Sequence, residues 1–182
     1  PDVPRLGGGD NVKRGRVSIR SNRMRRGKLI AFEGLDGSGK ATQARLLAER
    51  LARKGYPVAS IDFPQYGKKS AGLFEEYLRG SYGSAAEVSP YVASLFIAAD
   101  RYDGSFQIRK WLREGKTVIA DRYLFSNIAH QGGKFVNNPK EWDRYVEWLY
   151  GIEYGIFNIP KPDRVVFLAT SAGTSLRLGA KV

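Results

Sequence analysis

Apolar and polar positions along the chain form blocks that match the lengths of strands and helices. Four short, mostly apolar runs have the length of buried strands, and they cover residues 28–33, 57–63, 117–121 and 164–168. Longer stretches that suit helices separate them, at 41–54, 89–113 and 141–150. Strands that alternate with helices predict right-handed crossovers and a parallel sheet covered on both faces. The pattern therefore predicts an α/β fold.

The residues before Lys28 follow a different pattern. Residues 1–27 hold eight Lys and Arg against two acidic residues, so half of the chain's net charge of +12 lies in this short segment. It contains few apolar residues, and such a segment cannot bury enough surface to offset its ordering entropy. We expect a disordered basic tail over 1–27 and one domain over 28–182. Met24 is the only methionine, so 1–23 is an upstream or appended segment, an RNA-binding arm or an Arg-rich transit peptide.

Composition excludes several classes of site. The 182 residues contain no cysteine, which removes disulfides, thiolate catalysis and cysteine-based zinc sites. His130 is the only histidine, so a histidine-rich metal cage is excluded. No apolar run approaches the roughly 20 residues that span a bilayer, and we expect no membrane segment. Nucleic-acid binding is expected only through the basic tail.

A glycine loop stands between the first strand and the first helix. Its sequence, Gly34-Leu-Asp-Gly-Ser-Gly-Lys40, has the G-x-x-x-x-G-K spacing of a P-loop. Glycines let backbone N–H groups approach phosphate oxygens, the following helix points its positive end at them, and Lys40 can reach the terminal phosphates. The residues expected to bind the phosphates of a nucleotide are Gly34, Asp36, Gly37, Ser38, Gly39, Lys40, Ala41 and Thr42.

The loop lacks one part of the general motif. The hydroxyl that usually follows the lysine and holds Mg²⁺ is replaced by Ala41, and Thr42 lies about 100° further round the helix. Magnesium would then be held through water or by other carboxylates. Asp121, which ends the third strand, is the natural candidate. The alternative is that Asp121 is a strand-end residue paired with Arg122.

Four blocks in order make the chain recognisable. They are Phe32-Glu-Gly-Leu-Asp-Gly-Ser-Gly-Lys-Ala-Thr-Gln43, Phe63-Pro-Gln-Tyr-Gly67, Asp100-Arg101 and Asp121-Arg-Tyr-Leu-Phe-Ser-Asn-Ile-Ala-His-Gln131. Over about residues 28–168 the chain resembles the thymidylate kinase family. The resemblance implies a P-loop NTPase three-layer sandwich with a central parallel sheet. It also implies transfer of the ATP γ-phosphoryl group to dTMP with Mg²⁺, in a cytoplasmic homodimer that serves deoxynucleotide synthesis.

The resemblance also implies roles for single residues. Lys40, Asp36 and Arg122 would act in catalysis, with Asp36 facing the acceptor sugar and Arg122 holding the acceptor phosphate. Arg101 would donate to the thymine O4. The residues expected to line the acceptor site are Phe63, Tyr66, Ile97, Arg101, Arg122, Asn127, His130 and Gln131. Two alternatives stay open: Asp36 as a turn residue that caps its own backbone, and Arg101 as a solvated charge.

Two positions depart from the family. An aromatic ring that stacks on thymine usually stands four residues before the base-reading arginine, but here that residue is Ile97, and Phe96 is about 100° round the helix. His130 stands where a tyrosine usually lies under the deoxyribose and excludes a 2′-hydroxyl. We therefore expect weaker discrimination against ribose. The alternative is that His130 only forms hydrogen bonds within the pocket or helix.

The end of the chain departs most. In the family a helix, an Arg-rich lid and a last strand follow a strand like 164–168, and we expect this last strand and lid to be missing. Gly37 stands where some members carry a P-loop arginine, so only Arg177 and Lys181 remain downstream. We expect the chain to bind nucleotides, to turn over slowly or not at all, and to leave a sheet edge unpaired. Alternatives are a related nucleoside or nucleoside monophosphate kinase, or a catalytically incomplete nucleotide-binding P-loop protein.

Overall fold

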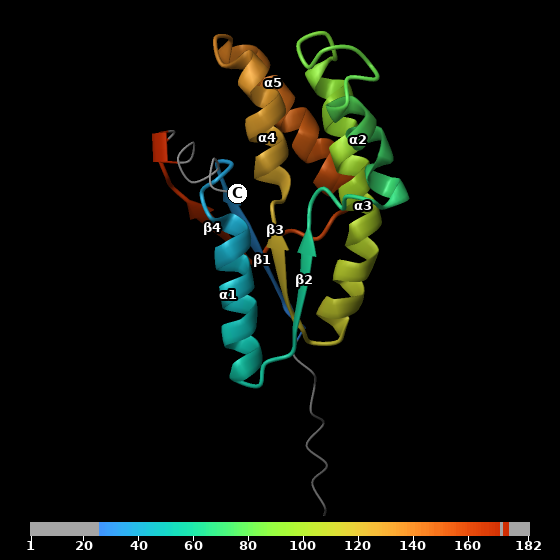
Figure 1. Ribbon diagram of the computed structural model, residues 1–182. Helices are drawn as coiled ribbons and strands as arrows, with labels where there is room; N and C mark the ends of the chain where they lie inside the picture. Colours follow the sequence, from blue (N-terminus) through green and yellow to red (C-terminus); the bar gives the residue numbers. More distant parts are fainter. Residues whose placement is uncertain (1–25, 172, 175–182) are drawn as a thin grey trace, which may run out of the picture.

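A four-stranded parallel sheet forms the centre of the computed structural model, which describes residues 26–171 and 173–174 (Figure 1). The strands are β1 (Lys28–Gly34), β2 (Val58–Asp62), β3 (Thr117–Asp121) and β4 (Arg164–Leu168), in the order β2-β3-β1-β4. The registers pair Phe32 and Asp62 with Asp121. The carboxyl ends of β1, β2 and β3 therefore meet at one edge of the sheet.

Helices cover both faces of this sheet. Helix α1 (Lys40–Arg53) packs on one face, and α3 (Pro90–Arg113) and α4 (Leu124–Gly132) pack on the other (Figure 1). The second face also carries α5 (Pro139–Tyr150), and α2 (Gly72–Leu78) packs on α3. Three short helical segments connect them: η1 (Lys69–Ala71), η2 (Gly133–Phe135) and the π-helical η3 (Gly151–Ile156). The predicted three-layer α/β fold is confirmed.

Alternating side chains of the strands build two cores. Phe32 and Ile119 point to α1 and pack with Ala44. Leu29 and Val118 point to the opposite face and join the larger core beneath α3, α4 and α5. Neighbouring residues on a strand face opposite sides, so a strand with both faces covered is apolar throughout. This is why β1 and β3 are continuous apolar runs in the sequence.

Most predicted element bounds hold to within two residues. The second strand is β2 at 58–62 rather than 57–63, although Pro57 accepts a hydrogen bond from Thr117 N. The last long helix starts at Pro139 rather than 141, because Asn138 caps it by accepting from Glu141 N at 3.3 Å. Helices α2 and α4 were not predicted. Both are short, with seven and nine residues, and neither has a side-chain N-cap to mark its start.

Some predictions fall outside the described residues. They include the tail over 1–25 and the two downstream cations Arg177 and Lys181. Gly27, which we assigned to the tail, is buried, and its N–H donates to Leu112 O at 2.8 Å. Its contact with α3 shows that the packed structure begins before Lys28. No helix in the described ranges is both long and apolar enough to cross a membrane.

Candidate functional site

The predicted P-loop turns between β1 and α1. Gly39 precedes the helix with φ 89°, in the left-handed region that a side chain disfavours. Gly34 has φ 147°, and a Cβ there would lie 2.7 Å from Leu168 O, so only glycine fits against β4. The loop thus brings its backbone to the carboxyl edge of the sheet, at the N-terminus of a 14-residue helix with no acidic residue in its first turn.

Lys40 lies folded against this loop. Its side chain is 5% exposed, and Nζ donates to Leu35 O at 2.6 Å. Burial, reinforced by the charge of Arg122, lowers the pKa of Lys40, and nearby carboxylates oppose this. Ala41 and Thr42 lie on the exposed side of α1, whereas Ser38 is buried with an Oγ that has no partner among the described residues. Lys40 therefore provides the buried positive charge of the loop.

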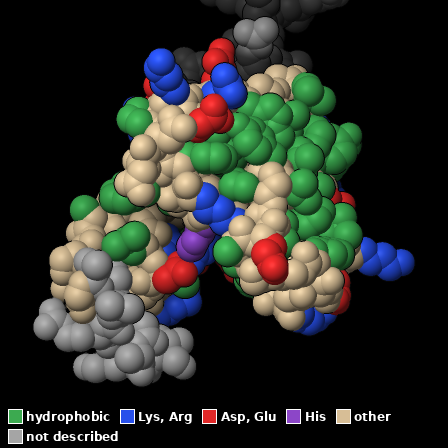
Figure 2. Space-filling model, turned by 90° about the horizontal axis from the view of Figure 1, so that it is seen from above, with side chains coloured by type: hydrophobic (Ala, Val, Ile, Leu, Met, Phe, Trp, Pro, Cys, Tyr) green, Lys and Arg blue, Asp and Glu red, His purple; other side chains and the backbone are tan. Residues whose placement is uncertain are grey.

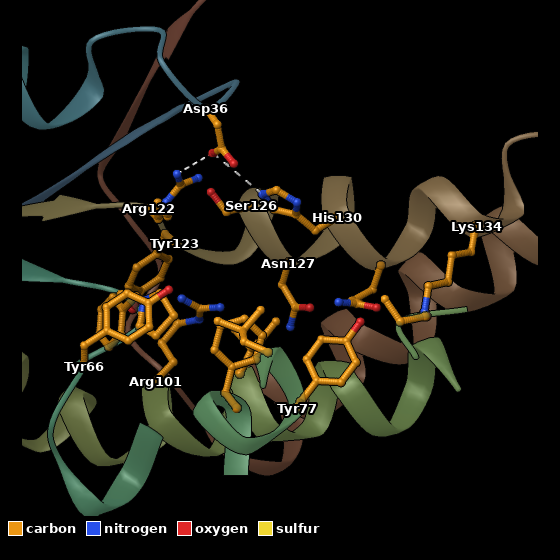
Figure 3. Close-up of a pocket in the computed structure, with 17 residues that line it drawn as sticks. Asp36, Tyr66, Tyr77, Arg101, Arg122, Tyr123, Ser126, Asn127, His130 and Lys134 are labelled. Atoms are coloured by element: carbon orange, nitrogen blue, oxygen red, sulfur yellow. Dashed lines mark hydrogen bonds and ion pairs between the residues drawn. The ribbon is translucent and has the colours of Figure 1, made fainter. Parts of the chain in front are cut away.

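Asp36, Arg122 and His130 converge at the mouth of a pocket (Figure 3). Arg122 follows β3 with φ 65°, which is unusual for a residue with a side chain, and Nη2 donates to Asp36. The Nε2 atom of His130 lies 4.0 Å from the same carboxylate. Burial acts to raise the pKa of Asp36, but the hydrogen bond and charge of Arg122 outweigh it and lower the pKa. Asp36 thus pairs with Arg122.

Asp121 lies beside this group at the end of β3. One carboxylate oxygen, Oδ1, is buried and has no hydrogen-bond partner among the described residues. Burial raises the pKa of Asp121; the charge of Asp62, its neighbour in the sheet, adds to this, while Arg122 and Lys40 oppose it. The alternative in which Asp121 pairs with Arg122 is not seen, because Arg122 forms its ion pair with Asp36. Asp121 thus presents an unpaired carboxylate oxygen at the carboxyl edge of the sheet.

Replacing Asp121 with asparagine is therefore expected to stabilise the ligand-free protein. A carboxyl with a raised pKa destabilises the fold above that pKa, and this penalty disappears as the pH falls below the ordinary value of 3.8. The D121N variant should melt a few degrees above the wild type at pH 8, and the gap should narrow as the pH is lowered. Differential scanning calorimetry measures this. A lower melting temperature for D121N at pH 8 would contradict it.

The pocket whose mouth is formed by Asp36, Arg122 and His130 has a volume of about 370 Å³ and lies between α2, α3 and α4. Figure 2 shows the histidine beside Lys or Arg side chains in the hollow of this face, next to a broad hydrophobic surface. Of the predicted acceptor-site residues, the structure brings all eight together in the wall: Phe63, Tyr66, Ile97, Arg101, Arg122, Asn127, His130 and Gln131. Further residues of the wall that we did not predict include Phe74, Tyr77, Tyr123 and Ser126.

Arg101 is held in the floor of this pocket. Only 1% of its side chain is exposed, and it donates to Glu153 from Nε at 2.7 Å and from Nη2 at 3.3 Å. Its guanidinium lies 5.1 Å from the ring centre of Phe63 and 5.2 Å from that of Tyr123. Its Nη1 has no partner among the described residues. The alternative of a solvated charge is wrong, and one donor of Arg101 remains free.

Asn127 and Gln131 present acceptors in the same wall. Asn127 Nδ2 donates to Ser94 O at 3.2 Å and to Glu153 at 3.4 Å, which leaves its Oδ1 without a partner among the described residues. Gln131 Oε1 is likewise buried and unpaired there. Ile97 lines the pocket, while Phe96 packs on Tyr82 with ring centres 5.5 Å apart. Of these two neighbours, Ile97 rather than Phe96 thus lines the pocket.

Buried acids that we did not predict hold the wall in place. Glu33 accepts from Tyr123 N at 2.9 Å and from Ser126, which ties the start of α4 to β1. Asp100 accepts from Gln65 N at 2.8 Å and so fixes the loop after β2. Glu33 and Asp100 both belong to the sequence blocks that resemble the family, but their spacing does not show which backbone groups they bind. Phe63 precedes a cis proline in this loop.

Comparisons with known proteins agree with this geometry. The family model described as thymidylate kinase matches residues 32–181. A thymidylate kinase of Mycobacterium tuberculosis is 36% identical over 145 residues, which are 79% of this chain and 66% of that protein. The human thymidylate kinase is 31% identical, over 86% of this chain and 67% of that protein.

A solved structure is similar as well. Thymidylate kinase from Candida albicans superposes with a TM-score of 0.68 at 31% identity, over 84% of this chain and 67% of that one, and its structure is described as revealing the origin of that enzyme's broad substrate specificity. This chain spans 66% of the length of the mycobacterial relative. The family model matches most of the chain, and the matched residues include the P-loop and the residues that line the pocket. The chain therefore belongs to the thymidylate kinase family.

Proposed function

We propose that this protein transfers the γ-phosphoryl group of ATP to dTMP and forms dTDP. The P-loop would bind the ATP phosphates, and the pocket next to it would bind dTMP. Arg122 lies between the two and offers a guanidinium fork of the kind that suits phosphate oxygens. Family membership supports this activity, and so does the volume of the pocket, which lies in the range of small-molecule sites.

One observation supports thymine most strongly. Four of the buried polar atoms without a partner among the described residues belong to the pocket: Nη1 of Arg101 and Arg122, Oδ1 of Asn127 and Oε1 of Gln131. Buried polar atoms normally have partners, so a cluster of unpaired ones indicates a polar ligand. Thymine presents an accepting O4 next to a donating N3–H. A donor from Arg101 beside acceptors from Asn127 and Gln131 complements that edge.

The chemistry needs positioning more than a covalent partner. Phosphoryl transfer between two anions requires alignment and positive charge around the transferred group. The buried Lys40 and the partly exposed Arg122 supply positive charge from two sides of the carboxyl edge of the sheet, and Asp36 orients Arg122. No general base is required of the protein. We propose Lys40, Asp36 and Arg122 as the catalytic residues.

The site also fits Mg²⁺ in part. The unpaired Oδ1 of Asp121 is an oxygen ligand of the kind that magnesium prefers. No group of three or more His, Cys, Asp or Glu that could hold a metal occurs among the described residues. Asp121 would therefore bind the ion together with water and phosphate oxygens, as Mg²⁺ commonly does. When bound, the ion would neutralise charge on the phosphates.

A homodimer is proposed on the exposed side of α3. Val92, Leu95, Tyr102 and Phe106 are 38–57% exposed and follow one another at helical spacing. An apolar stripe of this length on a soluble helix is typical of a protein interface. The cytoplasmic location implied by the resemblance stays a prediction.

Formation of dTDP tests the proposed function. The full chain is incubated with dTMP, ATP and Mg²⁺, and the products are separated by ion-exchange chromatography. We expect dTDP and ADP in equal amounts, formed at the slow rate that the sequence predicts, with none when either substrate is omitted. The identity of the product is the decisive reading, whatever the rate. ADP without dTDP, or no product above background, would overturn the proposal.

Wider acceptance of nucleotides is a second candidate property, because His130 lines the pocket with 55% of its side chain exposed. We expect the His130→Tyr variant to raise the preference for dUMP over UMP, in kcat/KM, by about tenfold, since a larger ring crowds a 2′-hydroxyl. Activity with dUMP itself should change little. An unchanged dUMP to UMP ratio would show that His130 does not control the sugar.

A further inference from the structure

A second cavity of about 370 Å³ lies at the opposite end of the sheet. Segments far apart in the sequence form it: Arg26 before β1, the last turns of α3, Tyr154 of η3, and the segment that enters β4. Its lining residues are Arg26, Arg109, Leu112, Arg113, Tyr154, Asn158, Ile159, Pro160 and Lys161. These segments stand at the amino ends of parallel strands, whereas the P-loop stands at the carboxyl ends. A strand of seven residues separates the two ends by about 20 Å.

The wall of this cavity is strongly basic. Arg26, Arg109, Arg113 and Lys161 contribute four positive charges, and no Asp or Glu lines it. In the described part of the chain, none of these four side chains has a carboxylate within ion-pair distance. The nearest acids in the sequence are engaged elsewhere: Asp163 pairs with Lys28 at 2.8 Å and Glu114 with Lys116 at 2.9 Å. Arg26 and Arg113 still contribute to the positive potential at these two acids, but no carboxylate pairs directly with any of the four cations in the described part of the chain.

Two of the cations are fixed in place by their surroundings. Arg109 donates to Ser105 Oγ and to Asn158 O, both at 2.6 Å. Asn158 has φ 49°, a left-handed conformation that asparagine tolerates better than most residues, and this turn presents its carbonyl to Arg109. Lys161 Nζ lies 5.2 Å from the ring centre of Tyr154. Cations held in this way lose less entropy when an anion binds.

A structural explanation accounts for only part of this arrangement. Basic residues often occupy the last turn of a helix, where they complement its dipole, and Arg113 lies there in α3. However, backbone groups already satisfy that helix end, since Gly27 N and Gly115 N both donate to Leu112 O. Arg26 and Lys161 come from other segments. Their convergence on one cavity needs a different reason.

We propose that this cavity binds a phosphate-bearing small molecule at a site separate from the kinase pocket. Four cations suit a group with two or more negative charges, and the fork of an arginine matches phosphate oxygens. Leu112, Ile159 and Pro160 supply an apolar side to the same cavity, so a phosphorylated compound with a flat or apolar part fits better than a bare anion. A ligand there would contact the amino end of β4 and the end of α3.

The test is an NMR titration of the ¹⁵N-labelled full chain, first with inorganic pyrophosphate and then with a nucleoside triphosphate. We expect the amides of Asn158 and Lys161 to shift and saturate, independently of the P-loop amides of Gly37 and Gly39. The Arg113→Glu variant should weaken binding at the second site by about tenfold or more and leave the P-loop shifts unchanged. Lys161→Glu should do the same, which guards against a local defect in one variant.

Lys110→Glu is the matched control. Lys110 is exposed in the same last turn of α3 but does not line the cavity, and its substitution changes the net charge equally. Unchanged binding in K110E supports the proposal. A lower Kd for the nucleoside triphosphate than for pyrophosphate supports the inference that the apolar side of the cavity contributes to binding. Shifts confined to the P-loop, or equal weakening in K110E and R113E, would overturn it. So would shifts at Asn158 and Lys161 that only a single-stranded RNA produces.

Discussion

Replacing Lys40 with alanine is expected to lower kcat/KM for dTDP formation by a factor on the order of 10³. Lys40 is buried at the start of α1, and its Nζ lies against the loop that would bind the ATP phosphates. Phosphoryl transfer depends on such fixed positive charge around the transferred group, and water cannot replace it in a closed loop. Initial rates at several ATP concentrations measure the effect.

The matched control for this variant is Lys54→Ala. Lys54 caps the other end of α1 and is exposed, so the substitution removes one lysine from the same helix without touching the loop. K54A should retain wild-type rates. Calorimetric binding of dTMP to K40A should also persist, because the acceptor pocket does not include Lys40. Wild-type activity in K40A, in a protein that still binds dTMP, would remove Lys40 from the mechanism.

Replacing Glu153 with alanine is expected to destabilise the fold by about 3–5 kcal/mol. Glu153 is fully buried and forms the ion pair that holds Arg101, so its loss leaves a buried guanidinium without a counter-charge. Without Glu153, the Arg101 side chain would also no longer be held in the orientation that leaves its Nη1 without a protein partner. Urea unfolding at neutral pH measures the change in the free energy of unfolding. Glu147→Ala, at an exposed position on α5, should leave it unchanged.

A double variant separates stability from binding. Replacing Arg101 with methionine and Glu153 with leucine removes both charges, and apolar pairs of similar volume often restore the stability of a buried ion pair. We expect R101M/E153L to unfold near the wild-type urea concentration but to lose selective binding of dTMP. Full stability in E153A would show that the pair is not structural. Selective dTMP binding in R101M/E153L would show that Arg101 does not bind the base.

The sequence predicts the scaffold well because local signals define it. The strands β1 and β3 can be predicted from their own apolar runs, and the P-loop from the glycines before Lys40, without reference to distant residues. The predicted residues of the pocket came from resemblance to a family. Local sequence patterns do not show that Tyr66, in the loop after β2, and Asn127, in α4, line the same pocket.

The residues that support the site were missed for a physical reason. Glu153 stands 52 positions after Arg101, in a π-helical turn that follows a run of aromatic residues. No sequence motif marks an acidic residue in such a run as functional. The burial of Glu153 is explained only by its ion pair with the buried Arg101. The basic cavity was missed likewise, because Arg26 and Lys161 are ordinary surface cations in the sequence and become neighbours only when β1 and β4 pair.

Calorimetric titration of the full chain with dTMP and then with dCMP tests the central claim most directly. The two nucleotides have the same sugar and phosphate, but cytosine presents a donor where thymine has O4 and an acceptor where thymine has N3–H. Against the free donor of Arg101 and the free acceptors of Asn127 and Gln131, this reversal leaves buried groups unpaired. We predict that dTMP binds about 100-fold more tightly than dCMP. Equal affinity for the two would contradict the account.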